Sequence, residues 1–182
     1  IAPGAQIISI FPGRTMHGLI EGAILAAQHE KVDVICLEPG ISIPAMYTLN
    51  DGRLVASLIF DRLVDKYQKL IFCPANNYAG VTTILDYIVG TNVIGVGGYQ
   101  SQDSYRINYG AEVSKKDNIH IVSSFGPGGN GALVPEILSP SGIISTDCGY
   151  KPPARLKGVY DLPPGYSIAS GTSTAGPSAT AA

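Results

Sequence analysis

The stretch TMHGLIEGAILAAQHEKVDVICL, residues 15–37, joins a helical pattern to a strand pattern. Apolar residues recur at helical spacing from Thr15 to about Lys31, and residues 32–37 form a short, nearly all-apolar run. A similar run at residues 5–11 is closed by Pro12-Gly13, which is typical of a buried strand followed by a turn. The stretch therefore predicts the helix and second strand of a strand–helix–strand unit.

The same alternation continues along the chain. Asn50 or Asp51 is a candidate N-cap for a helix that extends to about Gln68, and apolar runs at 69–73 and 92–97 follow as strands. Strands that alternate with helices, each strand nearly all apolar, predict a mainly parallel sheet with helices on both faces. We therefore expect an α/β protein with a three-layer α/β/α sandwich. Its 182 residues fit one domain.

The second half of the chain has a different composition. Beyond Gly98, polar and Gly/Pro-rich connections surround short apolar pieces at 119–122 and 142–145, which predicts long loops. Residues 147–165 contain two Pro-Pro pairs and predict a surface loop before Tyr166 re-enters the core.

Composition narrows the classes of partner. The chain is 45% hydrophobic and 14% charged, as in a densely packed protein, and its net charge of −2 includes no basic stripe for nucleic acid. No apolar run approaches the roughly 20 residues that span a membrane, and no targeting signal is visible from which a compartment could be read. No cysteine pair has zinc-ligand spacing, so Cys36 and Cys73 are interpreted as buried thiols, with one disulfide as the alternative.

The carboxyl-terminal segment SGTSTAGPSATAA, residues 170–182, places Ser173 in a run of small residues. Gly171 allows a tight turn, and the small residues allow a helix to begin at or just after the serine. A hydroxyl at a helix N-terminus lies beside unpaired N–H groups, which can stabilise an oxyanion. Residue types alone leave two interpretations open, a helix-capping serine and a nucleophile.

Residues 171–177, Gly-Thr-Ser-Thr-Ala-Gly-Pro, resemble the Gly-Thr-Ser-Met-Ala-Ala/Thr-Pro signature of subtilisin-like serine peptidases. Residues 1–5 resemble that family's Val-Ala-Pro-Gly-Ala, and residues 32–40 resemble its Asp-Val-Ile-Asn-Met-Ser-Leu-Gly strand. Residues 74–77 resemble Ala-Ala-Gly-Asn, and 123–127 resemble Ser-Ser-Arg-Gly-Pro. Ordered matches over nearly the whole chain are more specific than any one motif. Some spacings look closer to tripeptidyl peptidase II-like members.

The resemblance implies a subtilisin-like fold, incomplete in this chain, and a set of site residues. Ser173 would attack a peptide carbonyl, and the side-chain amide of Asn77 would hold the oxyanion. The implied substrate-binding residues are Glu38, Pro39, Gly40, Ala75 and Asn76. The family's catalytic Asp and His precede its Ala-Pro-Gly segment, so both are expected upstream of Ile1. This segment alone is therefore expected to be inactive, with its own histidines, His17, His29 and His120, as bystanders.

Glu38 departs from the family pattern, because it replaces a serine on the substrate-binding edge. Its carboxylate could receive a basic side chain or a free amino terminus, or it could turn to solvent. The expected partners are a peptide or protein substrate and the remainder of the catalytic domain. No cofactor is identified, and structural calcium is implied by the resemblance alone.

Two other functions remain open at this stage. A catalytically inactive, subtilase-like module could bind extended peptides at the Glu38 edge. A nucleotide-binding domain would rest only on the G-x-G-x-x-G match at residues 126–131, where Pro135 follows and no helical run begins. We therefore interpret residues 126–131 as a loop.

Overall fold

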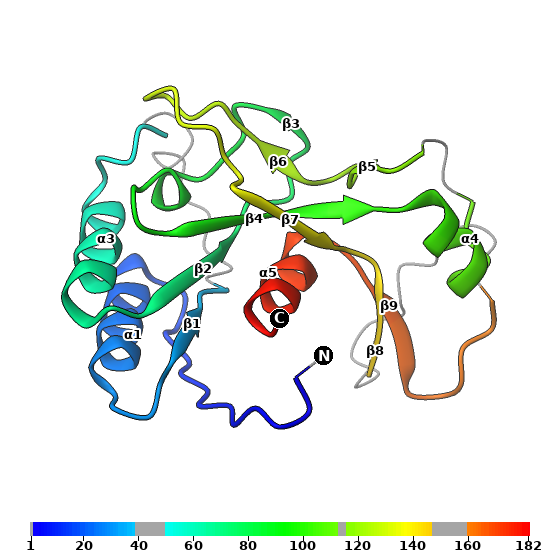
Figure 1. Ribbon diagram of the computed structural model, residues 1–182, viewed down its shortest axis with the longest axis horizontal. Helices are drawn as coiled ribbons and strands as arrows, with labels where there is room; N and C mark the ends of the chain where they lie inside the picture. Colours follow the sequence, from blue (N-terminus) through cyan, green and yellow to red (C-terminus); the bar gives the residue numbers. More distant parts are fainter. Residues whose placement is uncertain (1, 39–49, 113–115, 147–159) are drawn as a thin grey trace.

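A computed structural model describes residues 2–38, 50–112, 116–146 and 160–182. Its centre is a mainly parallel sheet in which β2 lies between β1 and β4, while β7 pairs with β4 in parallel and β5 pairs with the end of β4 antiparallel. The strands are β1 (Val34–Cys36), β2 (Leu70–Pro74), β4 (Ile94–Gln100), β5 (Asn118–Ile119) and β7 (Ile137–Pro140). Figure 1 shows β2, β4 and β7 crossing the middle of the molecule.

Helices cover both faces of this sheet. Helices α1 (Met16–Gln28) and α3 (Val55–Tyr67) pack against each other and form the main core with Ile35 of β1. Helix α5 (Thr172–Thr180) packs against β1, β2, β4 and β7, and its Thr180 lies near Cys36, the residue after Ile35 on β1. Because neighbouring strand residues point to opposite faces, α5 lies on the face away from α1 and α3. The predicted α/β/α sandwich is confirmed.

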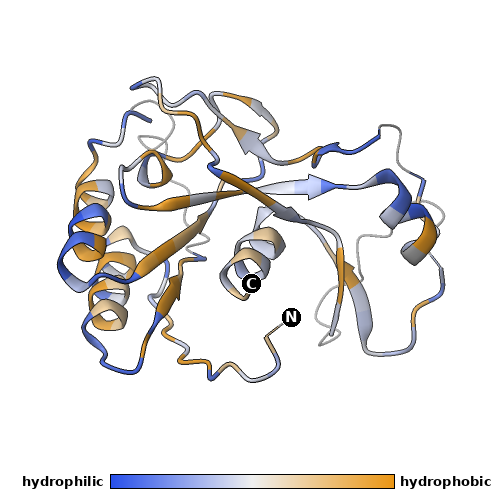
Figure 2. Cartoon of the chain, viewed as in Figure 1, coloured by the Kyte–Doolittle hydropathy of each residue, from blue (hydrophilic) through white to orange (hydrophobic). Residues whose placement is uncertain are grey.

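The main core is made of large apolar side chains. Leu19, Phe60 and Ile71 are almost fully buried in it, and the ring of Phe60 meets that of Tyr87 edge-on with centroids 6.3 Å apart. Figure 2 shows the hydrophobic colouring that runs along the central strands and on parts of α1 and α3. None of the helices in the described ranges is long and apolar enough to cross a membrane.

The start of α1 is as predicted, but the start of α3 is not. Thr15 is the N-cap of α1, and its hydroxyl accepts a hydrogen bond from Gly18 N at 3.1 Å. Helix α3 begins only at Val55, so neither Asn50 nor Asp51 is its N-cap. The 3-10 helix η1 (Asp86–Ile88) supplies the missing acceptor from a distant part of the chain.

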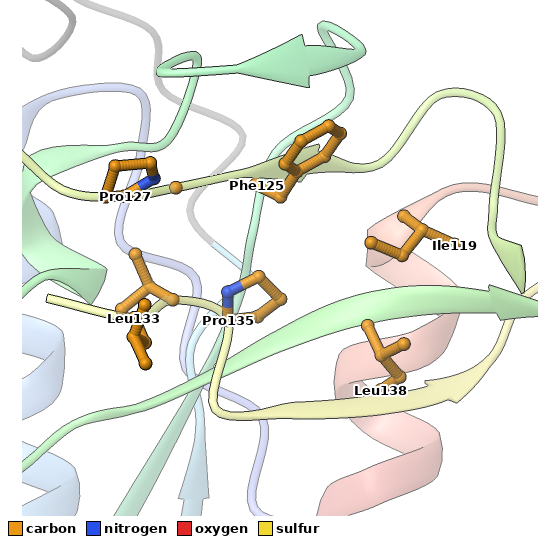
Figure 3. A pocket seen from close by; sticks show the side chains of 8 residues that line it. Ile119, Phe125, Pro127, Leu133, Pro135 and Leu138 are labelled. Atoms are coloured by element: carbon orange, nitrogen blue, oxygen red, sulfur yellow. The ribbon is translucent and has the colours of Figure 1, made fainter.

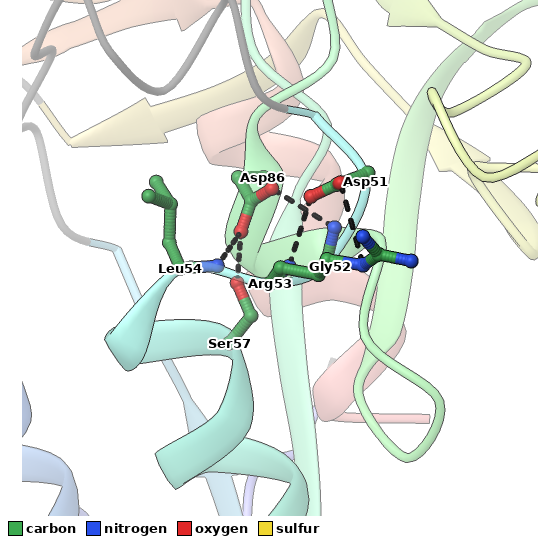
Figure 4. Close-up of polar contacts among 6 residues, drawn as sticks. All are labelled: Asp51, Gly52, Arg53, Leu54, Ser57 and Asp86. Atoms are coloured by element: carbon green, nitrogen blue, oxygen red, sulfur yellow. Dashed lines mark hydrogen bonds and ion pairs between the residues drawn. The ribbon is translucent and has the colours of Figure 1, made fainter.

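Asp86 is fully buried and holds the turn that leads into α3 (Figure 4). Its carboxylate accepts hydrogen bonds from Gly52 N at 2.9 Å, from Leu54 N at 3.1 Å and from the Ser57 hydroxyl. A carboxylate at this end of a helix satisfies N–H groups that have no partner within the helix. A tertiary contact therefore replaces the local cap that the sequence predicted.

The second half contains one helix that the sequence analysis did not predict. Helix α4 (Gln102–Tyr109) begins after Ser101, whose side chain accepts from Ser104 N, and ends at Gly110 with φ 68°. The remaining elements are short: β3 (Gly80–Val81) pairs in parallel with β6 (Ser124–Phe125), and β8 (Ile143–Thr146) pairs antiparallel with β9 (Tyr166–Ala169). The glycine-rich stretch 126–131 is a loop with no helix after it.

Two predictions about strand burial are wrong. Residues 5–11 form no strand, and Ile7 and Phe11 are 88% and 86% exposed. Within the described residues no strand pairs with this segment, and an apolar run does not form a strand without a neighbour for its N–H and C=O groups. Tyr166 is 49% exposed, and Ile168 is instead the buried residue of β9. Of the predicted loop 147–165, only 160–165 are described, and they are irregular and mostly exposed.

Candidate active site

Ser173 is the second residue of α5 and is exposed, so its hydroxyl is accessible. The preceding Gly171 adopts φ 106°, and a Cβ built on it would lie 3.0 Å from Asn77 Oδ1. Both the conformation and the close contact require glycine. The buried Ser141 fixes this turn, because its hydroxyl accepts from Gly171 N at 2.9 Å and donates to Gly171 O at 3.1 Å.

The side chain of Asn77 meets the same turn. Its Oδ1 accepts hydrogen bonds from Thr172 N at 2.7 Å and from Thr172 Oγ1 at 3.1 Å, across 95 residues of sequence. Because a backbone N–H can only donate, the atom that faces Thr172 is the amide oxygen. The amide nitrogen Nδ2 is therefore on the other side of the group. The structure thus brings the Asn77 amide next to the residue that precedes Ser173.

Asn76 and Ala75 lie just before this amide. Asn76 has φ 96°, its Oδ1 accepts from Asn77 N at 2.8 Å, and its Nδ2 donates to Thr83 O at 3.2 Å. Its side chain therefore holds the loop that carries Asn77. Ala75 is fully buried, and its N–H donates to Val96 O at 2.9 Å. A role for either residue in substrate binding stays a prediction.

Glu38 reaches α5 from the end of β1. Its carboxyl group accepts a hydrogen bond from the Cys36 thiol, with 3.9 Å between Cys36 Sγ and Glu38 Oε1, and it lies near the side chain of Ser173. A Cβ built on Gly176 would lie 2.6 Å from the same Oε1, so the absence of a side chain at Gly176 makes room for the carboxyl group. The sequence did not indicate whether the Glu38 side chain points toward the substrate or into solvent. Pro39 and Gly40, the other residues of the predicted edge, lie outside the described residues.

The environment of Glu38 favours its neutral form. Although the residue as a whole is exposed, desolvation of the carboxyl group against α5 raises its pKa from 4.5 to about 8, despite the opposing hydrogen bonds from Ser173 and Cys36. Burial also raises the pKa of the Cys36 thiol and, more strongly, that of the fully buried Cys73 thiol on β2. Both thiols are free, but only Cys73 is buried as predicted, and Cys36 is half-buried.

The histidines of this chain are engaged elsewhere. His17 forms an exposed pair with Glu21 on α1 at 3.2 Å, and His29 Nδ1 accepts from Lys31 N. His120 is buried, which lowers its pKa, and its Nδ1 is 3.4 Å from Val122 N. None of these contacts involves Ser173.

Three residues around the site were not assigned a role from the sequence: Ser141, Thr172 and Cys36. The buried hydroxyl of Ser141 holds the Gly171 turn, and the buried hydroxyl of Thr172 accepts from Asn76 N and donates to Asn77 Oδ1. Cys36 contacts Glu38. Small hydroxyl residues are common throughout this sequence, so their types carry no signal. Only proximity in the fold identifies them.

Within the described ranges, no group of three or more His, Cys, Asp or Glu residues could hold a metal ion. An apolar pocket of about 270 Å³ lies between β5, β6 and β7 and is lined by residues that include Phe125, Leu133 and Leu138 (Figure 3). Ser173, Asn77 and Glu38 do not line it.

Comparison with known proteins identifies solved structures that have a similar fold. No protein-family model matches the chain. Among solved structures, a lanthipeptide protease is similar with a TM-score of 0.57 and 18% identity over 91% of this chain and 49% of that one. PagA, the prenylagaramide maturation protease, is similar with a TM-score of 0.57 and 15% identity over 99% and 50%. A cold-adapted subtilisin-like serine proteinase is similar with a TM-score of 0.52 and 19% identity over 92% and 46%.

The chain therefore spans about half the length of each of these structures. At such identities the likeness concerns the fold alone. Together with the mainly parallel sheet and its two helical layers, it shows that this chain has a subtilisin-like α/β fold.

Proposed function

We propose that this chain carries the nucleophile and the oxyanion hole of a serine peptidase that hydrolyses peptide bonds through an acyl-enzyme on Ser173. One observation carries the proposal: the amide oxygen of Asn77 is bonded to Thr172, the residue before an exposed Ser173 at the start of α5. A nucleophile and an amide donor are thereby brought to one place on a helix N-terminus.

The reaction follows from these positions. The Ser173 hydroxyl oxygen attacks the peptide carbonyl carbon as its proton leaves to a base, and the carbonyl electrons move to the oxygen. The N–H of Ser173 belongs to the first turn of α5, where N–H groups have no partner within the helix, and it would donate to that oxygen together with Asn77 Nδ2. Both donors are fixed before charge develops, because Asn77 is held through its other amide atom.

The substrate and the rest of the catalytic machinery are also part of the proposal. A peptide substrate is supported by the descriptions of two similar structures as peptide-processing proteases. The catalytic Asp and His would be supplied by sequence upstream of Ile1. Glu38, Pro39 and Gly40 would form the edge on which the substrate lies.

A fluorophosphonate probe tests the proposal on the full-length protein. We expect the wild type to be labelled covalently, Ser173→Ala not to be labelled, and Ser170→Ala, which removes a nearby exposed serine, to be labelled as wild type. Labelling that persists in Ser173→Ala would refute the assignment. Peptide binding without any labelling of the wild type would support the inactive binding module instead.

A further inference from the structure

Gly171 is the N-cap of α5, and it has no side chain with which to cap the helix. Its φ of 106° and ψ of 171° lie in a region that only glycine occupies readily, and such a conformation persists only where surrounding groups hold it in place. Its carbonyl accepts hydrogen bonds within the helix from Thr174 N at 3.1 Å and from Thr174 Oγ1 at 2.9 Å. Its N–H is bonded instead to Ser141, 30 residues earlier in the chain.

Ser141 lies between β7 and β8, and its buried hydroxyl makes two bonds to Gly171. Its Oγ accepts from Gly171 N at 2.9 Å and donates to Gly171 O at 3.1 Å. A hydroxyl can donate one hydrogen bond and accept two, so this one side chain engages both backbone polar groups of Gly171. Two bonds to the same residue limit rotation about either bond, and they therefore fix the orientation of Gly171 as well as its position.

The backbone of Ser141 is itself held by two other elements. Its N–H donates to Tyr99 O on β4 at 3.0 Å, and its carbonyl accepts from the Tyr105 hydroxyl on α4 at 2.6 Å. Tyr105 is almost fully buried, and its hydroxyl can approach because Gly142 has no side chain; a Cβ built on Gly142 would collide with it. All the polar groups of Ser141 thus have partners, which connect α4 and β4 to the turn before Ser173.

We propose that Ser141 is a positioning residue for the nucleophile: through Gly171 it fixes the start of α5, and thereby the places of the Ser173 hydroxyl and N–H. The inference rests on the proposed function and deepens it, because it names a residue on which the alignment of the nucleophile depends. Ser173 is two residues beyond Gly171, and Asn77 is bonded to Thr172 between them. Attack and oxyanion binding at one carbonyl require this alignment, and a misplacement of about 1 Å can lower a rate by roughly 10²-fold.

Removal of the Ser141 hydroxyl should loosen this alignment without altering a reacting group. In Ser141→Ala the N–H of the buried Gly171 loses its partner, so the turn should relax toward other conformations. Because the Ser141 hydroxyl is buried and bonded to Gly171, it is not offered to the substrate. We therefore expect kcat to fall while KM changes little.

Active-site titration of the full-length protein separates positioning from stability. A fluorophosphonate counts the competent Ser173 sites, and kcat on a peptide substrate is then expressed per titrated site. We expect Ser141→Ala to lower kcat per site by roughly 10²-fold with an almost unchanged KM. The matched control Ser57→Ala also removes the hydroxyl of a fully buried serine, but on α3 at the other face of the sheet. It should lower the melting temperature without changing kcat per site.

Tyr105→Phe provides a second variant, which retains the ring and removes only the hydroxyl that donates to Ser141 O. It should lower kcat per site by a smaller factor than Ser141→Ala. A wild-type kcat per site in Ser141→Ala, or in Tyr105→Phe where Ser141→Ala does not fold, would overturn the inference. A rise in KM at constant kcat would also overturn it and assign Ser141 to substrate binding. The proposed function would survive either result if Ser173→Ala still abolished labelling, and would fall only if labelling persisted in Ser173→Ala.

Discussion

The two faces of the central sheet are built from alternate residues of the same strands, yet they differ in chemistry. The face toward α1 and α3 is packed with large apolar side chains such as Ile35, Ile71 and Phe60. The face toward α5 carries Cys36 and, just beyond β1, Glu38, against a helix composed only of Gly, Ala, Pro, Ser and Thr.

The two faces of the sheet therefore have different roles: one stabilises the fold, and the other carries the groups of the candidate site. Large side chains on the first face bury apolar area and stabilise the fold. The small side chains of α5 allow this helix to lie close to the sheet, so that the Asn77 amide and the Glu38 carboxyl group meet its amino-terminal half near Ser173. Variants on one face should therefore leave the properties of the other face largely unchanged.

The largest effect is expected for Phe60→Ala on the α1–α3 face. Phe60 is fully buried, and its truncation should lower the free energy of unfolding by about 3–5 kcal/mol, measured by urea denaturation. The control Leu58→Ala removes a side chain on the same helix that is 56% exposed, and should cost far less. A loss below about 1 kcal/mol in Phe60→Ala would contradict the described core.

An effect of comparable free energy, but on the rate of the reaction, is expected for Asn77→Asp on the α5 face. The aspartate retains an oxygen that can accept from Thr172 but lacks the Nδ2 donor. We expect kcat on a peptide substrate to fall by roughly 10²–10³-fold, the range established by removing the corresponding type of donor in a subtilisin. Thermal melting should show that the fold is retained. A near-normal kcat would remove Asn77 from the oxyanion hole.

A smaller effect on stability is expected for Gly176→Ala. Alanine in place of a helical glycine favours the helix by roughly 0.5–1 kcal/mol, and the displacement of Glu38 opposes this gain. The free energy of unfolding, measured by urea denaturation, should therefore change by less than about 1 kcal/mol. A large loss of stability would indicate that the atoms around Gly176 cannot move.

The smallest effect is expected in the pH dependence of stability, because Glu38 is an exposed residue and solvent screening weakens the contribution of its pKa shift to the free energy of unfolding. Because the folded protein raises the pKa of Glu38 from 4.5 to about 8, the folded state binds the proton more tightly than the unfolded state. This contribution is complete below about pH 4.5 and is lost as the pH rises toward 8. Glu38→Gln should therefore show a weaker decline in melting temperature between pH 5 and pH 8 than the wild type. An identical decline in both proteins would show that folding does not raise the pKa of Glu38.

The sequence predicted most of the elements that form the α1–α3 face of the sheet, because apolar periodicity is a local signal. It located β1, β2, β4 and the helices α1 and α3, and it placed Ser173 at the start of a helix. It missed α4, whose Ser101 cap lies in a polar stretch, and it gave α3 a local cap in place of Asp86.

The contact between Glu38 and α5 corresponds to two departures from the family motifs, which the sequence analysis did not connect. Glu38 is larger than the serine, and Gly176 smaller than the alanine or threonine, of the motifs that the chain resembles. In the structure these two departures meet, because the carboxyl group occupies the space that a side chain at Gly176 would fill.

The sequence alone determined the alternation of strands and helices and the small-residue helix that begins near Ser173, since both depend on neighbouring residues. Only the tertiary structure decided that Asn77 and Glu38 meet that helix, that Asp86 caps α3, and that residues 5–11 form no strand. Contacts between distant segments depend on how layers pack and which strands find neighbours, and local sequence patterns carry no record of either.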